Sequence, residues 1–129
     1  MSSSKRVLCI GINASKRDTT ETRNASPPEE IRRMMSSQIQ EAKDAGFNLH
    51  VELVAPDEMA EKLLYVRDLL GQEHWDGFIV GGGIRKASEL TEHFEDFVNA
   101  SREIRPLAKM GFNTIPGDLP AAMRRMFDN

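Results

Sequence analysis

The chain has 129 residues, of which 40% are hydrophobic and 29% are charged, a balance typical of one folded globular domain. Its net charge of −3 excludes an overall basic surface for nucleic acid or anionic lipid. The apolar segments are too short for a signal peptide or a membrane span, so we expect a cytoplasmic protein without a nucleic-acid or membrane partner.

The elements alternate between strand and helix along the whole chain. In chain order we predict a strand at 5–13, a polar loop at 14–25, a helix opened by Ser26 and stopped by Gly46, a strand at 47–56, a helix from Asp57 to Gly71, a strand at 75–80, a helix from Ser88 to 105, a strand at 107–113 and a closing helix capped by Asp118. The first helix carries Met35, Ile39 and Ala42 on its expected buried face.

Four strand–helix units predict a single α/β domain over 1–129, built as a three-layer sandwich around a four-stranded parallel sheet. The first and third strands are continuously apolar, whereas the second alternates between apolar and polar residues. Because continuously apolar strands are expected in the middle of a sheet, we predict the flavodoxin-like strand order 2-1-3-4. The two open edges of such a sheet allow a homodimer.

The single cysteine, Cys9, lies inside the apolar run VLCIGI. A nucleophilic cysteine needs an accessible, electropositive setting, and a disulfide needs a second cysteine. The sequence therefore predicts that Cys9 is a small buried hydrophobic residue.

In parallel sheets of this order, ligands bind beyond the carboxyl ends of the strands, near the switch point between strands 1 and 3. The residues that follow those strand ends are the expected substrate-binding residues: Asn13, Gly81, Gly82, Gly83, Arg85, Asn113 and Thr114. Their amide, hydroxyl and guanidinium groups suit a small organic substrate, and Arg85 favours an anionic one.

The run Gly81-Gly82-Gly83-Ile84-Arg85 fits neither the dinucleotide fingerprint nor the Walker phosphate loop. Three glycines after a central strand leave no side chains above it, so we interpret the run as a floor cleared for a ligand. The alternative is a tight turn with Arg85 in solvent.

The loop at 14–25 is either a lid, with Lys16, Arg17 and Arg23 available to an anion, or plain chain. It contains no glycine, which disfavours the flavin-phosphate loop of flavodoxins. Asn13 and Gly81 stand where a phosphorylated receiver domain needs carboxylates, which disfavours that class. We expect no cofactor.

Glu89, His93 and Asp96 share one flank of the third predicted helix. His93 with Glu89 is the candidate pair for proton transfer. The alternative is a solvated surface pair. No second histidine or cysteine supports a metal site, so none is predicted.

Three motifs lie in the C-terminal half: GGGIR (81–85), FEDFVN (94–99) and FNTIPGD (112–118). With them the chain resembles a family of small flavodoxin- or Rossmann-like α/β hypothetical proteins that has no assigned activity. That family is marked by Gly-x-Gly, an aliphatic residue and Arg, and by Phe-Asn-Thr-x-Pro-x-Asp. The resemblance implies the fold and adds no chemistry, and it implies an apolar residue at the position of His93.

The sequence therefore favours a small-molecule enzyme of the isomerase, lyase or cyclase type that works without a redox cofactor. His93 and Glu89 would transfer protons, and the substrate would lie at the carboxyl edge of the sheet. The alternative is a non-catalytic module that binds a nucleotide, a flavin or another anionic metabolite.

Overall fold

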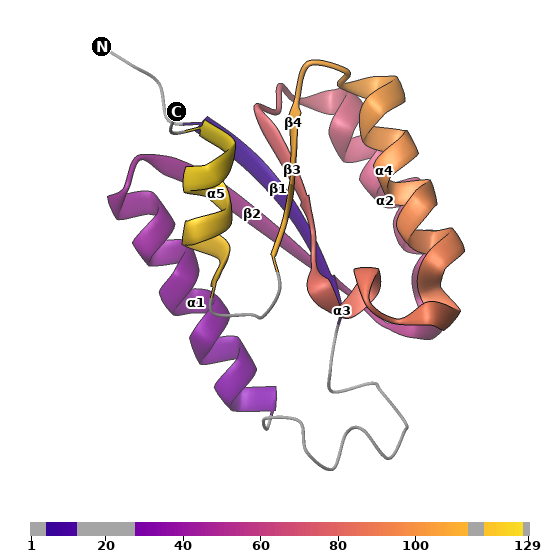
Figure 1. Ribbon diagram of the computed structural model, residues 1–129, viewed down its shortest axis with the longest axis horizontal. Coiled ribbons are helices and arrows are strands. Elements are labelled where there is room, and N and C mark those ends of the chain that lie inside the picture. The colour runs from indigo at the N-terminus through magenta and orange to yellow at the C-terminus, as the bar shows by residue number, and fades with distance from the viewer. Residues whose placement is uncertain (1–4, 13–27, 114–117, 128–129) are drawn as a thin grey trace.

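A computed structural model describes residues 5–12, 28–113 and 118–127 of the chain (Figure 1). Its elements are β1 (Lys5–Ile12), α1 (Pro28–Asp44), β2 (Phe47–Val54), the 3-10 turn η3 (Pro56–Glu58), α2 (Met59–Gln72), β3 (Gly77–Val80), α3 (Gly82–Arg85), the 3-10 turn η4 (Ser88–Leu90), α4 (Thr91–Ile104), β4 (Lys109–Phe112) and α5 (Leu119–Phe127).

The four strands form one parallel sheet in the order β2-β1-β3-β4, which confirms the predicted flavodoxin-like arrangement. The order follows from burial. Side chains 7–10 of β1 and 78–80 of β3 are almost completely inaccessible, so both strands need neighbours on each side and helices on each face. The alternating strand β2 lies at an edge, as expected.

Helices cover both faces of the sheet, as Figure 1 shows, with α1 and α5 on one side and α2 and α4 on the other. Successive strand residues point to opposite faces and so build two separate cores. On β1, Leu8 and Ile10 pack toward α2 and α4, whereas Val7 and Cys9 pack toward α1 and α5. The three-layer α/β sandwich is confirmed.

Cys9 is 2% exposed, and burial raises the pKa of its thiol to about 12. A thiol with so high a pKa holds almost no nucleophilic thiolate at neutral pH. The prediction that Cys9 is a buried apolar residue is therefore confirmed.

Two glycines let α5 approach the sheet closely. A Cβ atom at Gly77 of β3 would lie 2.6 Å from the Cε of Met126, and one at Gly111 of β4 would overlap the sulfur of the same side chain. Met126 therefore occupies the space that side chains would take at both positions.

Two predicted helix starts are wrong. Asp57 and Ser88 do not cap the helices that follow them, because the chain enters both helices through a 3-10 turn. The residues at the helix N-caps are Glu58 for α2 and Leu90 for α4, and neither makes a side-chain capping hydrogen bond. Asp57 and Ser88, the residues typical of a helix cap, belong to the 3-10 turn and not to the boundary of the α-helix that follows.

The remaining boundaries differ by a few residues. The third and fourth strands begin two residues later than predicted, at Gly77 and Lys109, and α2 continues past Gly71 to Gln72. Gly46 does stop α1, with the positive φ of 93° that favours glycine. The predicted cap Ser26 and the loop at 14–25 lie outside the described residues.

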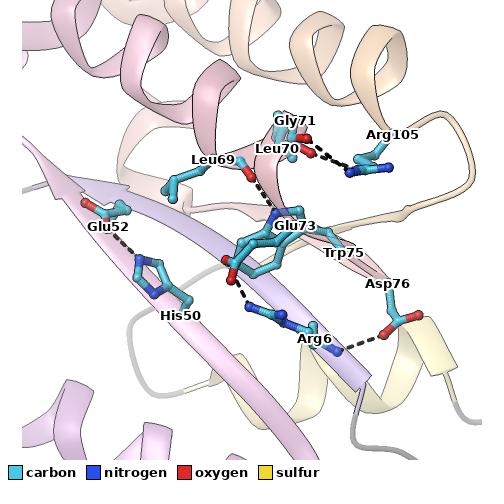
Figure 2. Close-up of polar contacts among 10 residues, drawn as sticks. All are labelled: Arg6, His50, Glu52, Leu69, Leu70, Gly71, Glu73, Trp75, Asp76 and Arg105. Atoms are coloured by element: carbon cyan, nitrogen blue, oxygen red, sulfur yellow. Dashed lines mark hydrogen bonds and ion pairs between the residues drawn. The ribbon is translucent and has the colours of Figure 1, made fainter.

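The amino edge of the sheet, where its strands begin, is closed by polar contacts (Figure 2). The backbone N–H of Arg6 donates to the carboxylate of Asp76 (2.9 Å), and the guanidinium of Arg6 pairs with Glu73 (3.0 Å) and lies 5.0 Å from the ring centre of Trp75. Arg105 donates to the carbonyl of Leu70 (2.7 Å) near the end of α2. These contacts join the starts of the strands to the end of α2, so they serve the stability of the fold.

Candidate functional site

The carboxyl edge, where the strands end, is the place at which the fold rule puts a ligand. The described strands end there at Ile12, Val54, Val80 and Phe112. Of the predicted binding residues, Asn13 and Thr114 lie outside the described residues. The structure gives the positions of the glycine run, Arg85 and Asn113.

The glycine run forms a short helical turn. Gly81 caps it with φ −68° and ψ 154°, which any residue adopts, and its carbonyl accepts hydrogen bonds from the N–H groups of Ile84 and Arg85 (both 3.1 Å). The N–H of Gly81 donates to the carbonyl of Ile10 in β1 (2.8 Å). The turn is thereby attached to the neighbouring strand.

The need for glycine here is a matter of space. A Cβ atom at Gly81 would lie 3.1 Å from the Ile10 carbonyl oxygen, and one at Gly83 would lie 3.2 Å from the side chain of Ile12. In the direction that a Cβ atom would take, the space at these two glycines is therefore occupied by β1, while Gly83 itself is exposed. Our interpretation of the run as a cleared floor is corrected for Gly81 and Gly83, which serve close packing.

Arg85 ends this turn, and its side chain is directed to the end of β4. Its guanidinium lies 5.8 Å from the ring centre of Phe112, and one terminal nitrogen donates to the backbone carbonyl of Asn113 at 3.4 Å. Arg85 remains exposed overall. The alternative of a tight turn is thus correct for the backbone, and the guanidinium has a defined position at the carboxyl edge.

The structure brings Arg85, Asn113 and Gly81 together. Asn113 is 5% exposed, and its side-chain oxygen lies 3.6 Å from the place of a Cβ atom on Gly81. Residues 81, 85 and 113 come from two neighbouring strand ends, as their sequence positions predicted.

An aromatic pair supports this cluster and was missed by the sequence reasoning. The rings of Phe94 in α4 and Phe112 in β4 are 5.9 Å apart and tilted by 49°. Phe112 therefore packs on α4 and also underlies Arg85. Its place two residues before Thr114, in the motif FNTIPGD, was the available signal. A shallow hollow beside β4 shares Phe112 and is otherwise lined by Met110, Gly111, Ala122, Arg125 and Met126.

Glu89 and His93 occupy the start of the α4 segment but are not joined to each other. Glu89 lies in η4 and is exposed, whereas His93 lies in the first turn of α4 and is half-buried. Within the described part of the chain, neither side chain makes an ion pair or hydrogen bond with the other. The proton-transfer pair therefore stays a prediction.

The other ionisable clusters have structural partners. His74 is exposed and pairs with Asp76, and His50 pairs with Glu52 on the edge strand. Among the described residues, no three His, Cys, Asp or Glu side chains are grouped to hold a metal ion. Likewise, no helix in the described ranges is both long and apolar enough to cross a membrane.

Comparison of the chain with protein-family models, with curated proteins and with solved structures gave no match.

Proposed function

We propose that this chain binds a small organic anion at the carboxyl edge of its sheet, with Arg85 as the main charged contact. The observation that carries the proposal is the placement of the Arg85 guanidinium between Phe112 and the carbonyl of Asn113. This cation lies at the carboxyl edge of a parallel sheet, at the end of β4, in a chain whose net charge is −3.

The chemistry of the guanidinium suggests the ligand class. The contact with Asn113 uses one terminal nitrogen, and a guanidinium has five N–H donors in a planar fork. The remaining donors suit a carboxylate or a phosphate, which a guanidinium binds with two parallel hydrogen bonds. The ring of Phe112 gives such a ligand an apolar neighbour.

A reaction on this ligand is the second step of the proposal. His93 lies in the first turn of α4, a helix that packs through Phe94 against the strand end beneath Arg85. We propose that His93, with Glu89 nearby in sequence, transfers a proton in a non-redox isomerase, lyase or cyclase reaction. Binding has the stronger support, because Arg85 has a defined contact and the two acid–base residues do not contact each other.

Thermal unfolding with defined probes tests the binding step. Inorganic phosphate, citrate, AMP and FMN are each added at ionic strength matched with chloride. A probe that saturates the native site raises the Tm by several degrees. We expect a rise with at least one of these anions, and a much smaller rise in Arg85→Ala.

Arg102→Ala is the matched control, because Arg102 is an exposed arginine in the last turn of α4, near the amino edge. It removes the same charge and should keep the full rise in Tm. The binding proposal fails if no probe exceeds chloride, or if Arg85→Ala and Arg102→Ala behave alike.

Solvent deuterium exchange tests the proton transfer. We expect His93 to catalyse exchange of the hydrogens next to a carboxylate in citrate, followed by NMR in heavy water. His93→Gln should abolish this exchange and leave the citrate-induced rise in Tm in place. Equal exchange in both proteins would remove His93 from the proposed reaction.

A further inference from the structure

Among the described residues, the outer side of β2 is an unpaired strand edge eight residues long. In the described part of the chain, β1 is its only neighbour in the sheet. The N–H of Lys5 donates to the carbonyl of Gly46, so residues 46, 48, 50, 52 and 54 direct their backbone groups to β1. The backbone groups of Phe47, Leu49, Val51 and Leu53 therefore face away from the sheet.

Two side chains that pair with each other, His50 and Glu52, stand next to each other along this strand. His50 and Glu52 lie on the same face, contact each other, and have side chains that are 45% and 16% exposed. Glu52 also accepts a hydrogen bond from Lys62 of α2 (3.1 Å). The ring of His50 meets that of Trp75 edge to face, with ring centres 6.1 Å apart; Figure 2 shows both residues and the contact of His50 with Glu52. Both side chains are thus held in place beside the open edge.

We propose that the β2 edge binds a second copy of this chain, through antiparallel pairing of β2 with β2 about a two-fold axis at Val51. The two four-stranded sheets then become one continuous sheet. Val51 exchanges backbone hydrogen bonds with Val51 of the second copy, and Leu49 does so with Leu53 of the second copy. Each residue that exchanges backbone hydrogen bonds in this pairing has backbone groups that face away from β1.

The match of an imidazole donor with a carboxylate acceptor selects this register. With Val51 on the axis, His50 lies directly opposite Glu52 of the second copy, and the axis repeats the pair. Both are residues whose backbone groups face β1, so they form the non-hydrogen-bonded type of pair, in which side chains approach most closely. A shift of the axis to Leu49 would place His50 opposite Asn48 and would shorten the paired region.

The helices that contact β2 on its two faces each carry an exposed apolar side chain. On α1, Ile39 is 37% exposed. The expected burial of Ile39 against the sheet is thereby corrected. On α2, Tyr65 is 45% exposed and packs beside Lys62, the residue that reaches β2.

The opposite edge of the sheet is a poorer partner. β4 has four residues, and its outward carbonyl at Phe112 accepts a hydrogen bond from Arg125 (2.9 Å). The inference about β2 is independent of the anion site at the carboxyl edge.

Sedimentation velocity of the whole chain over a range of concentrations tests the proposal. The expected mass is twice 14.5 kDa. Val51→Pro removes an outward N–H that β1 does not use, and should give a folded monomer. Met110→Pro is the matched control, because the N–H of Lys109 donates to the carbonyl of Asp76, just before β3, and the backbone groups of Met110 therefore face outward on β4. It should remain dimeric.

If Val51→Pro prevents folding, substitutions of His50 and Glu52 test the β2 dimer instead. His50→Glu sets like charges opposite each other twice and should weaken the dimer about tenfold. Exchange of the two residues, His50→Glu with Glu52→His, should restore it. A monomeric wild-type chain would overturn the proposal. So would a dimer that neither Val51→Pro nor His50→Glu weakens.

Discussion

The carbonyl oxygen of Ile10 accepts the N–H of Gly81 at 2.8 Å and lies 3.1 Å from where a Cβ atom of that glycine would stand. One oxygen atom of a central strand thus fixes the turn below Arg85 and excludes a side chain from its first residue. The backbone of Gly81 is in an ordinary extended conformation, so its identity is set by packing alone.

Gly81→Ala should therefore destabilise the protein by roughly 1–3 kcal/mol, because the crowded neighbour is backbone inside a sheet and cannot easily move. Urea unfolding measures the change. Gly71→Ala is the control: apart from its own helix, the nearest atom to its added methyl would be the Cγ2 of Ile104, at 4.0 Å, and a glycine in the last turn of α2 should gain up to about 1 kcal/mol as alanine. Equal effects at both positions would contradict the packing argument.

The sheet order could be predicted because the pattern of apolar and polar residues in each strand shows how deeply that strand is buried. The apolar runs 7–10 and 78–80 require central strands, and the alternation in β2 requires an edge. The exact starts of α2 and α4 could not be predicted, since Asp57 and Ser88 serve a 3-10 turn as readily as a helix cap.

The location of the candidate site could be predicted from the sequence, but the contacts among its residues could not. The fold rule located Gly81, Arg85 and Asn113 at neighbouring strand ends. It could not show that Ile12 fills the space beside Gly83, because that contact depends on the direction of the turn after β3. The contact of Arg85 with Phe112 depends on tertiary packing between β4 and α3 in the same way.

Asp76 should make the fold sensitive to acid. Burial alone would raise the pKa of its carboxyl, but the hydrogen bonds from the Arg6 backbone and from His74, with nearby positive charge, lower it overall. The native pKa is then below the unfolded one, so the stabilisation is complete above about pH 5 and is lost as the pH falls through the native pKa.

Asp76→Asn should therefore lower the free energy of unfolding at pH 7 by about 1–2 kcal/mol and should lose less stability than wild type on acidification. Denaturant titrations from pH 7 to 3 follow both proteins. Asp96→Asn, at an exposed position of α4, is the control and should keep the wild-type pH profile. Parallel profiles for wild type and Asp76→Asn would contradict the role of this carboxylate.

Cys9 should report on opening of the central strand. Its thiol is 2% exposed and its pKa is raised to about 12, so thiol reagents should react only in molecules that unfold. The modification rate under native conditions should fall as any ligand raises the Tm, and urea should accelerate it. Rapid labelling of the folded protein would show that β1 is more accessible than its packing indicates.

Cysteine pairs should report the register of the β2 dimer. In the proposed pairing, position 50 faces position 52 of the second copy at about 4.5 Å between Cα atoms, a separation that a disulfide can bridge. Chains with His50→Cys mixed with chains with Glu52→Cys should oxidise to a covalent dimer. Each variant alone should not, because its two cysteines would be diagonal at about 7–8 Å. Efficient crosslinking of either variant alone would contradict the register.

The anion site at the carboxyl edge is tested most directly by a titration of the 15N-labelled protein with inorganic phosphate and then with citrate. The amide signals of Gly82 to Arg85 and of Asn113 should move most, and Arg85→Ala should abolish their movement. Signals at the amino edge, near Arg6 and Arg105, should remain in place. Shifts confined to the amino edge, or an unchanged spectrum with both anions, would contradict the proposed site.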